Sequence, residues 1–174
     1  IALAKKTSDR LIARDPEHAI WSLNAAYIED ELACLAALDG RADEAAAFAD
    51  KAVILARRVF ERDTSDLNAR VALAATLARR LQISGNAQMP AMIADELAAL
   101  FEKIILEPKP RDLAVVGAAA IALVQFETER GESAKAARYA AEGERLLGSR
   151  EGNLSVGARL ALAQLFFENG DLGN

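Results

Sequence analysis

The chain has 174 residues, of which 52% are apolar and 27% charged, a balance typical of a globular protein rather than a disordered one. Its formal net charge is −5, with 21 basic and 26 acidic residues interspersed along it. No sustained positive field is therefore available for nucleic acid or an anionic bilayer, and neither is an expected partner.

Alanine and leucine dominate the composition. The sequence contains 39 alanines and 23 leucines but only 4 prolines, and aromatic residues make up 5%. Alanine and leucine favour helices, and small side chains let helices approach closely. The longest apolar run, at 113–124, is well short of the roughly 20 residues that span a bilayer. We therefore expect an all-α fold of packed helices with no membrane insertion.

The helices are predicted from two interleaved sets of signals. Residues 1–13 supply the end of one helix. Caps of aspartate or asparagine then mark helix starts at Asp15, Asp63, Asp112 and Asn153, and turn glycines follow each predicted first helix at Gly40, Gly85, Gly131 and Gly170. Each set recurs at a nearly constant interval. First helices are expected at 17–38, 66–83, 112–129 and 154–168, and second helices at 42–61, 90–106 and 133–147.

Helix caps and turn glycines that recur at the same interval predict a repeated unit of two helices. A single helical hairpin cannot bury its apolar stripe alone, so each hairpin is expected to stack on its neighbours. The whole chain, 1–174, is thus interpreted as one helical repeat domain, with units at 15–62, 63–111 and 112–152 and a partial unit at 153–174.

The stretch LACLAALDGRADEAAAFADKA resembles the tetratricopeptide repeat. Ala45 and Ala52 lie five and twelve positions after Gly40, where that family turns and packs its helix pairs, and Phe166 lies four before Gly170, at an aromatic position of the family. The unit of about 45 residues resembles the long-helix variants of the family, and the tip at 84–90 departs from the pattern. The resemblance implies a right-handed superhelix, or α-solenoid, with a concave groove lined by the first helix of each pair.

The same resemblance implies which residues line that groove for a peptide or a partner's helix. Counting back from each glycine gives Asp30, Glu31, Thr76, Arg79, Gln125, Thr128 and Gln164. The lysine and asparagine clamp with which some members hold a C-terminal carboxylate is not matched. The partner is therefore a protein or peptide of unknown identity.

Residues that could carry catalysis are few. The single histidine, His18, is expected to cap a helix or lie on the surface, and Cys34, flanked by leucine and alanine, is expected to be an inert buried thiol. The acidic run 29–31 is interpreted as a solvated face or part of a groove, because consecutive helix positions cannot converge on one ion. Trp21 is expected to anchor the core. No catalytic residue, cofactor or metal is predicted.

The leading hypothesis is a non-enzymatic scaffold module for protein-protein or peptide binding, within a larger, bacterial-looking protein and in the cytoplasm, with the periplasm as the alternative. A ligand-sensing regulatory domain, attached to a kinase or a DNA-binding domain, is the second hypothesis. The final hairpin lacks its second helix, so we also expect self-association through an open C-terminal end, at Leu160, Leu162, Leu165, Phe166 and Phe167.

Overall fold

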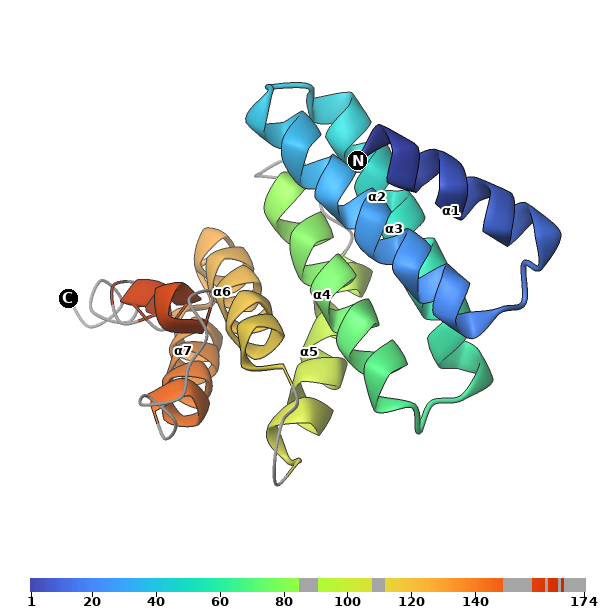
Figure 1. The fold of residues 1–174 in the computed structure, drawn as a ribbon. Helices are drawn as coiled ribbons and strands as arrows, with labels where there is room; N and C mark the ends of the chain where they lie inside the picture. Colours follow the sequence, from blue (N-terminus) through green and yellow to red (C-terminus); the bar gives the residue numbers. More distant parts are fainter. Residues whose placement is uncertain (85–90, 108–111, 149–157, 162, 166, 168–174) are drawn as a thin grey trace. The chain divides into compact units, whose positions relative to one another are not determined.

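The computed structural model describes residues 1–84, 91–107, 112–148, 158–161, 163–165 and 167 (Figure 1). All regular secondary structure in these ranges is helical: α1 (Ala2–Arg14), α2 (Ala19–Leu38), α3 (Ala42–Arg62), α4 (Leu67–Ser84), α5 (Ala91–Ile105), α6 (Leu113–Glu129) and α7 (Ser133–Gly148). Residues 158–161, 163–165 and 167 are helical as well. The helices α1 to α7 begin and end close to the predicted positions, never more than two away, and the all-α class is confirmed.

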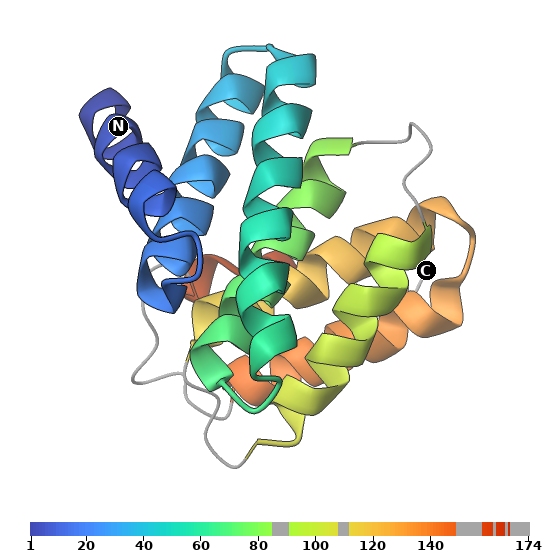
Figure 2. The same ribbon diagram turned by 90° about the vertical axis from the view of Figure 1, so that its right-hand side faces the viewer.

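The chain divides into two compact units, Ile1–Gly85 and Asn86–Asn174. In the first unit α1 packs against α2, α2 against α3 and α3 against α4, and α2 also contacts α4. In the second unit α5 packs against α6, and α6 against α7. Helices that follow one another in the sequence are thus packed as antiparallel pairs within each unit (Figures 1 and 2). The boundaries of the expected hairpin repeats stay a prediction.

Two of the predicted glycine turns have the same geometry. Gly40 and Gly131 have φ values of 74° and 76°, in the left-handed region that favours glycine. After α2, Arg41 N–H donates to the Ala36 carbonyl and Gly40 N–H to the Ala37 carbonyl. After α6, Glu132 and Gly131 donate to the corresponding carbonyls. This pair of bonds is the Schellman closure of a helix end. Gly85 and Gly170 lie outside the described residues.

The corner between α1 and α2 recurs between α3 and α4. Asp15 ends α1 and its Oδ1 accepts from Glu17 N–H at 3.1 Å. Asp63 ends α3 with similar backbone angles, and its Oδ1 accepts from Ser65 N–H at 2.9 Å. His18 N–H and Asp66 N–H then donate to the carbonyls of these two aspartates. The two corners therefore correspond residue by residue, with Asp15 aligned on Asp63.

These corners correct two of the predicted helix starts. Asp15 and Asp63 are the C-caps directly after the preceding helices, and the N-caps of the next helices lie three positions further on, at His18 and Asp66. An aspartate side chain can accept a backbone N–H two positions ahead in a turn as well as at a helix start, so sequence alone does not separate the two roles. Asp112 is a helix cap as predicted, since its Oδ1 accepts from Ala114 and Val115 N–H. Asn153 lies outside the described residues.

The core of the first unit consists largely of alanine. Fully buried alanines lie on each of α2, α3 and α4, among them Ala26, Ala45, Ala52 and Ala72, all 0% exposed. Side chains this small let the helix backbones approach closely, as the composition predicts. The expected tight contacts at Ala45 and Ala52 are confirmed, and Ala136 in the second unit is likewise 0% exposed.

The second unit combines an aromatic contact with close backbone approaches. Phe101 of α5 meets Tyr139 of α7 edge-on, with 5.9 Å between the ring centroids. A Cβ atom added at Gly117 of α6 would lie 2.4 Å from the Cβ of Ala161. The helical segment at 158–161 therefore touches α6 at a point where only glycine fits.

Candidate functional site

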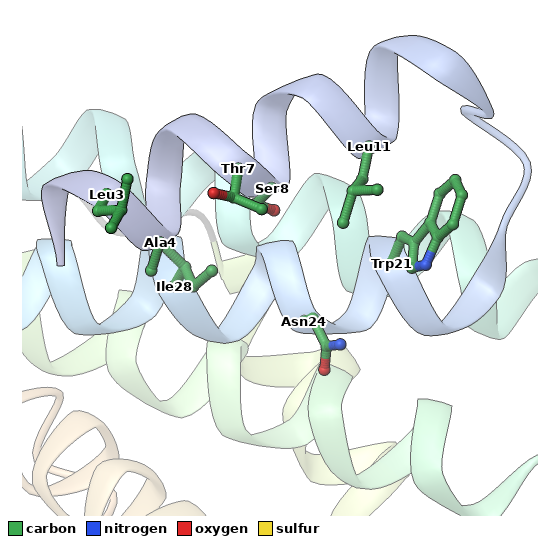
Figure 3. Close-up of a pocket in the computed structure, with 8 residues that line it drawn as sticks. All are labelled: Leu3, Ala4, Thr7, Ser8, Leu11, Trp21, Asn24 and Ile28. Carbon is green, nitrogen blue, oxygen red and sulfur yellow. The ribbon is translucent and has the colours of Figure 1, made fainter.

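A groove between α1 and α2 is a concave feature of the first unit. It encloses about 450 Å³ and is lined by Leu3, Ala4, Thr7, Ser8, Leu11, Trp21, Asn24 and Ile28 (Figure 3). Five of these side chains are apolar, and Thr7, Ser8 and Asn24 supply hydroxyl and amide groups. Leu3 is 78% exposed and Trp21 and Ile28 are half-buried, so the groove presents apolar surface to solvent.

Helical spacing explains why these side chains meet. Leu3, Thr7 and Leu11 recur at every fourth position and form one row along α1. Trp21, Asn24 and Ile28 are spaced by three and then four positions on α2 and form the facing row. The Trp21 ring also stacks on His18, with 4.1 Å between the ring centroids. The groove is thus built from two regular helix faces.

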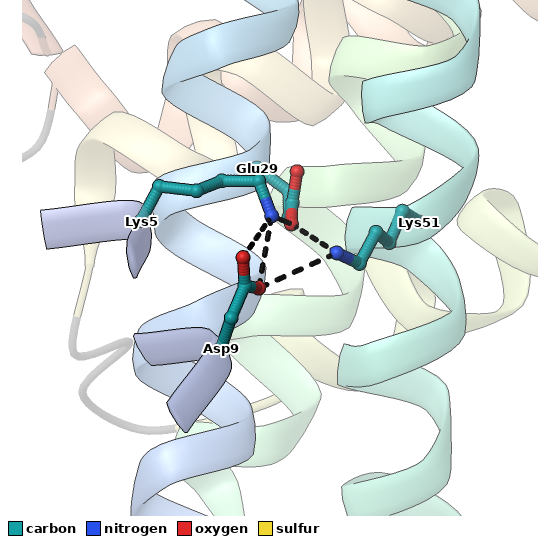
Figure 4. A network of polar contacts seen from close by, with 4 residues as sticks. All are labelled: Lys5, Asp9, Glu29 and Lys51. Atoms are coloured by element: carbon teal, nitrogen blue, oxygen red, sulfur yellow. Dashed lines mark hydrogen bonds and ion pairs between the residues drawn. The ribbon is translucent and has the colours of Figure 1, made fainter. Parts of the chain in front are cut away.

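A buried carboxylate ties α1 and α3 to α2. The Glu29 side chain is 2% exposed, and its Oε1 lies 2.8 Å from Lys5 Nζ and 2.6 Å from Lys51 Nζ. Asp9 joins the same cluster, with its Oδ1 2.9 Å from Lys5 Nζ and 3.7 Å from Lys51 Nζ (Figure 4). The interpretation of the acidic run 29–31 as a solvated face or part of a groove is therefore wrong for Glu29, which is buried and whose charge is balanced inside the unit by two lysines.

The charged side chains of this cluster shift one another's pKa values. Burial opposes the charge of Lys5, but its hydrogen bonds to Glu29 and Asp9 raise its pKa above the usual range. The hydrogen bond from Lys5 lowers the pKa of Asp9. Lys5 and Asp9 are separated by one helical turn, on a different face of α1 from the row of Leu3, Thr7 and Leu11. The ion pairs therefore hold α1 in the rotation that turns that row into the groove.

The predicted groove residues of the first unit lie on α2 and α4. Asp30 and Arg79 are brought together as an ion pair, with 3.5 Å between Oδ2 and Nε, and Glu31 beside them is exposed. Burial raises the pKa of Asp30 although Arg79 acts in the opposite direction. Thr76 is 0% exposed and its hydroxyl donates to the Leu73 carbonyl at 3.0 Å, so its side chain does not reach a surface. The position of Thr76 in the sequence of α4 does not reveal that the side chain is buried.

The remaining predicted groove residues belong to the second unit. Gln125 is half-buried and Thr128 exposed, three positions apart on α6, and Gln164 is exposed in the last helical segment. The structure leaves their assignment as partner contacts untested. The α1 row of the groove is not among the residues predicted from the sequence, although Leu3, Thr7 and Leu11 have helical spacing, because residues 1–13 are predicted only as the end of a helix.

His18, Trp21 and Cys34 are placed as follows. His18 caps α2 as expected: its Nδ1 accepts from Trp21 N–H at 3.4 Å. Trp21 is a half-buried groove residue rather than a fully buried core anchor, and Cys34 is half-buried rather than buried. Trp21 is half-buried because it lines the groove between α1 and α2.

Metal-binding clusters and membrane-spanning helices are both absent from the described residues. Among the described residues, no three His, Cys, Asp or Glu side chains gather in a way that could hold a metal ion. Within the same residues, no helix has the length and hydropathy needed to cross a membrane. Comparison with protein-family models, curated proteins and solved structures finds no match for the chain.

Proposed function

We propose that the chain is a non-enzymatic scaffold module that binds a protein or peptide partner. The observation that carries the proposal is the groove between α1 and α2, in which Leu3, Leu11 and Trp21 present apolar surface without a covering element in the described part of the chain. Burial of apolar surface stabilises a complex by about 25 cal/mol per Å² before the costs of association. A polypeptide that covers this groove would bury these side chains.

The tetratricopeptide resemblance adds an architectural proposal. Antiparallel helix pairs and the two matching glycine closures support a stack of helical hairpins, in which the pairs wind into a right-handed superhelix. Within this proposal the first unit contributes Asp30, Glu31 and Arg79 as polar partner contacts, and the second unit contributes Gln125, Thr128 and Gln164. A cytoplasmic location within a larger protein is part of this proposal.

A ligand-sensing regulatory domain is the second candidate. The groove volume of about 450 Å³ falls in the range of small-molecule sites, roughly 300 to 1,000 Å³. Such sites surround most of their ligand, whereas Leu3 and Thr7 are exposed here and Trp21 is half-buried. The scaffold function fits this open trough better.

A peptide-display selection tests the proposal. Random peptides long enough to form several helical turns are selected on the chain. They are then measured against Ala4→Tyr, which fills the groove, and against Ala13→Tyr, a matched change at an exposed position of α1 outside the groove. Selected peptides are expected to lose binding to Ala4→Tyr and to keep it with Ala13→Tyr. Equal binding to both variants contradicts the groove as the binding site. Stabilisation by small apolar molecules in a thermal-shift screen, with no peptide recovered, favours the sensor.

A further inference from the structure

The groove on α1 and α2 corresponds to the surface of α3 and α4 on which α2 packs. Because the α1–α2 corner matches the α3–α4 corner, with Asp15 aligned on Asp63, each groove residue has a counterpart on α3 or α4. Apart from Lys51, the counterpart of Leu3, these residues are no more than 7% exposed: Ala52, Leu55, Ala56, Val59, Ala69, Ala72 and Thr76. The helix that packs on both α3 and α4 is α2. Equivalent surfaces are thus covered by a helix in one repeat and uncovered in the other.

The ion pairs of α2 identify the face that it covers. Arg79 lies three positions after Thr76 on the same face of α4, and it pairs with Asp30 of α2. At the other end of α2, Arg62 pairs with the Glu17 carboxylate and donates to the Glu17 carbonyl. A covering helix is therefore held by an acid at its start and by a second charge between three and four helical turns later.

The counterparts of these two arginines set the charge of the missing helix. Arg62 corresponds to Arg14, which keeps the positive charge, and Arg79 corresponds to Glu31, which reverses it. Arg14 and Glu31 are exposed, and neither takes part in an ion pair within the described ranges. Lys51, which contacts Glu29 of α2, corresponds to the apolar Leu3. A helix that binds in the groove would therefore contact the cation Arg14, the apolar Leu3 and the anion Glu31.

We propose that the groove docks one amphipathic helix of a partner protein, seated as α2 is seated on α3 and α4. The inference rests on the proposed function and gives the partner's chemistry. The partner helix presents small and apolar side chains to the groove, an acid near its start beside Arg14, and a base between three and four turns later beside Glu31. A second copy of this chain does not supply that pattern through α2 or α4, the first helices of its pairs. For α2 the two positions are Glu17, just before the helix, and Asp30; for α4 they are Ser65, just before the helix, and Ala78.

The test uses peptides that carry the α2 pattern. Both consist of residues 17–38 with Trp21→Phe and Glu29→Leu, and one of them also carries Asp30→Lys. Because the chain has a single tryptophan, Trp21 fluorescence reports occupation of the groove, and calorimetry gives Kd. The lysine peptide is expected to bind about 2- to 5-fold more tightly than the matched aspartate peptide, the range of an exposed ion pair. The Glu31→Lys variant of the chain is expected to reverse this order.

Further variants separate the possible results. Ala4→Tyr is expected to abolish binding of the lysine peptide and Ala13→Tyr to leave it unchanged. Two results overturn the helix proposal but leave the scaffold function standing, provided that peptides from the display library occupy the groove. The first is that the lysine peptide does not bind. The second is that Glu31→Lys does not reverse the order of the two peptide affinities. The helix proposal is also overturned if sedimentation shows that the chain self-associates and that Ala4→Tyr abolishes this association. A second copy of the chain would then be the occupant of the groove. Failure of every peptide counts against the scaffold function itself.

Discussion

Arg79 of α4 and Asp30 of α2 form an ion pair between two helices that are separated in the chain by the whole of α3. Both side chains are largely shielded, with exposed fractions of 33% and 15%. Burial raises the pKa of Asp30, and the Arg79 guanidinium acts in the opposite direction by favouring the ionised carboxylate. The ion pair therefore helps to fix how α2 packs against α4.

Charge reversal at Arg79 is therefore expected to affect the fold as well as any partner. Arg79→Glu places a second carboxylate beside Asp30, and we expect the free energy of unfolding to fall by about 1 to 3 kcal/mol, measured by urea denaturation. Arg80→Glu is not a neutral control, because Arg80 pairs with Asp50. The double variant Arg79→Met with Asp30→Leu should recover most of the loss, and failure to recover it contradicts the pairing.

The Glu29 cluster gives a second prediction. Replacement of both Lys5 and Lys51 by methionine leaves a carboxylate that is 2% exposed without a cation, and we expect a loss of about 3 to 5 kcal/mol in the free energy of unfolding. Adding Glu29→Met to the same variant removes the buried charge and should restore much of that stability. A double variant as stable as the natural chain would show that the lysines do not balance Glu29.

The pH dependence of this cluster follows from two shifts of opposite sign. The pKa of Lys5 is raised, so its contribution is complete below the ordinary lysine value of 10.5 and is lost as the pH rises through the folded value. The pKa of Asp9 is lowered, so its contribution is present above 3.8 and is lost as the pH falls through the folded value. The stability difference between the natural chain and Lys5→Met should therefore be largest between about pH 4 and 10. A difference that peaks outside this window contradicts the assignment.

Gly117 of α6 should not tolerate a side chain. Alanine is the better helix former by about 1 kcal/mol, but its Cβ atom would lie 2.4 Å from that of Ala161. We expect Gly117→Ala to lower the melting temperature, with a net cost of about 1 to 3 kcal/mol. Gly148→Ala is the matched control, since nothing lies within 4 Å of the added atom. A stabilised Gly117→Ala variant would place the segment at 158–161 away from α6.

Ala52 tests the packing of the first unit. It is 0% exposed on α3, so Ala52→Leu overpacks the contact and should cost about 1 to 3 kcal/mol in urea denaturation. Ala47 lies on the exposed face of the same helix, and Ala47→Leu should change stability by less than about 0.5 kcal/mol. Equal effects of the two substitutions would contradict the register of α3.

Self-association through the C-terminal end remains a separate prediction. Leu160 and Phe167 are 67% and 70% exposed, as expected, but Leu165 is 0% exposed and does not belong to that surface. Phe166 and Leu162 lie outside the described residues. If this end associates, Phe167→Asp should shift sedimentation to the monomer while the lysine peptide still binds the groove. Loss of peptide binding in Phe167→Asp would place the two functions on one surface.

Local chemistry determined the helices and their turns. Alanine and leucine propensity, glycine at positive φ and the helical spacing of apolar residues act over short stretches of chain, so Gly40 and Gly131 and the helix bounds could be predicted. The same local signals marked the corners after α1 and α3 but misplaced their caps, because Asp15 and Asp63 accept equivalent backbone bonds in a turn.

Only the tertiary structure decided which polar residues are buried and which apolar ones are left uncovered. Glu29, Asp30 and Glu31 are adjacent acids in the sequence, yet one is buried between two lysines, one pairs with an arginine of another helix and one faces solvent. The exposed row on α1 likewise cannot be told from a core stripe by its spacing. Burial and pairing depend on which helix lies opposite, and that partner comes from a distant part of the chain, about which a local pattern carries no information.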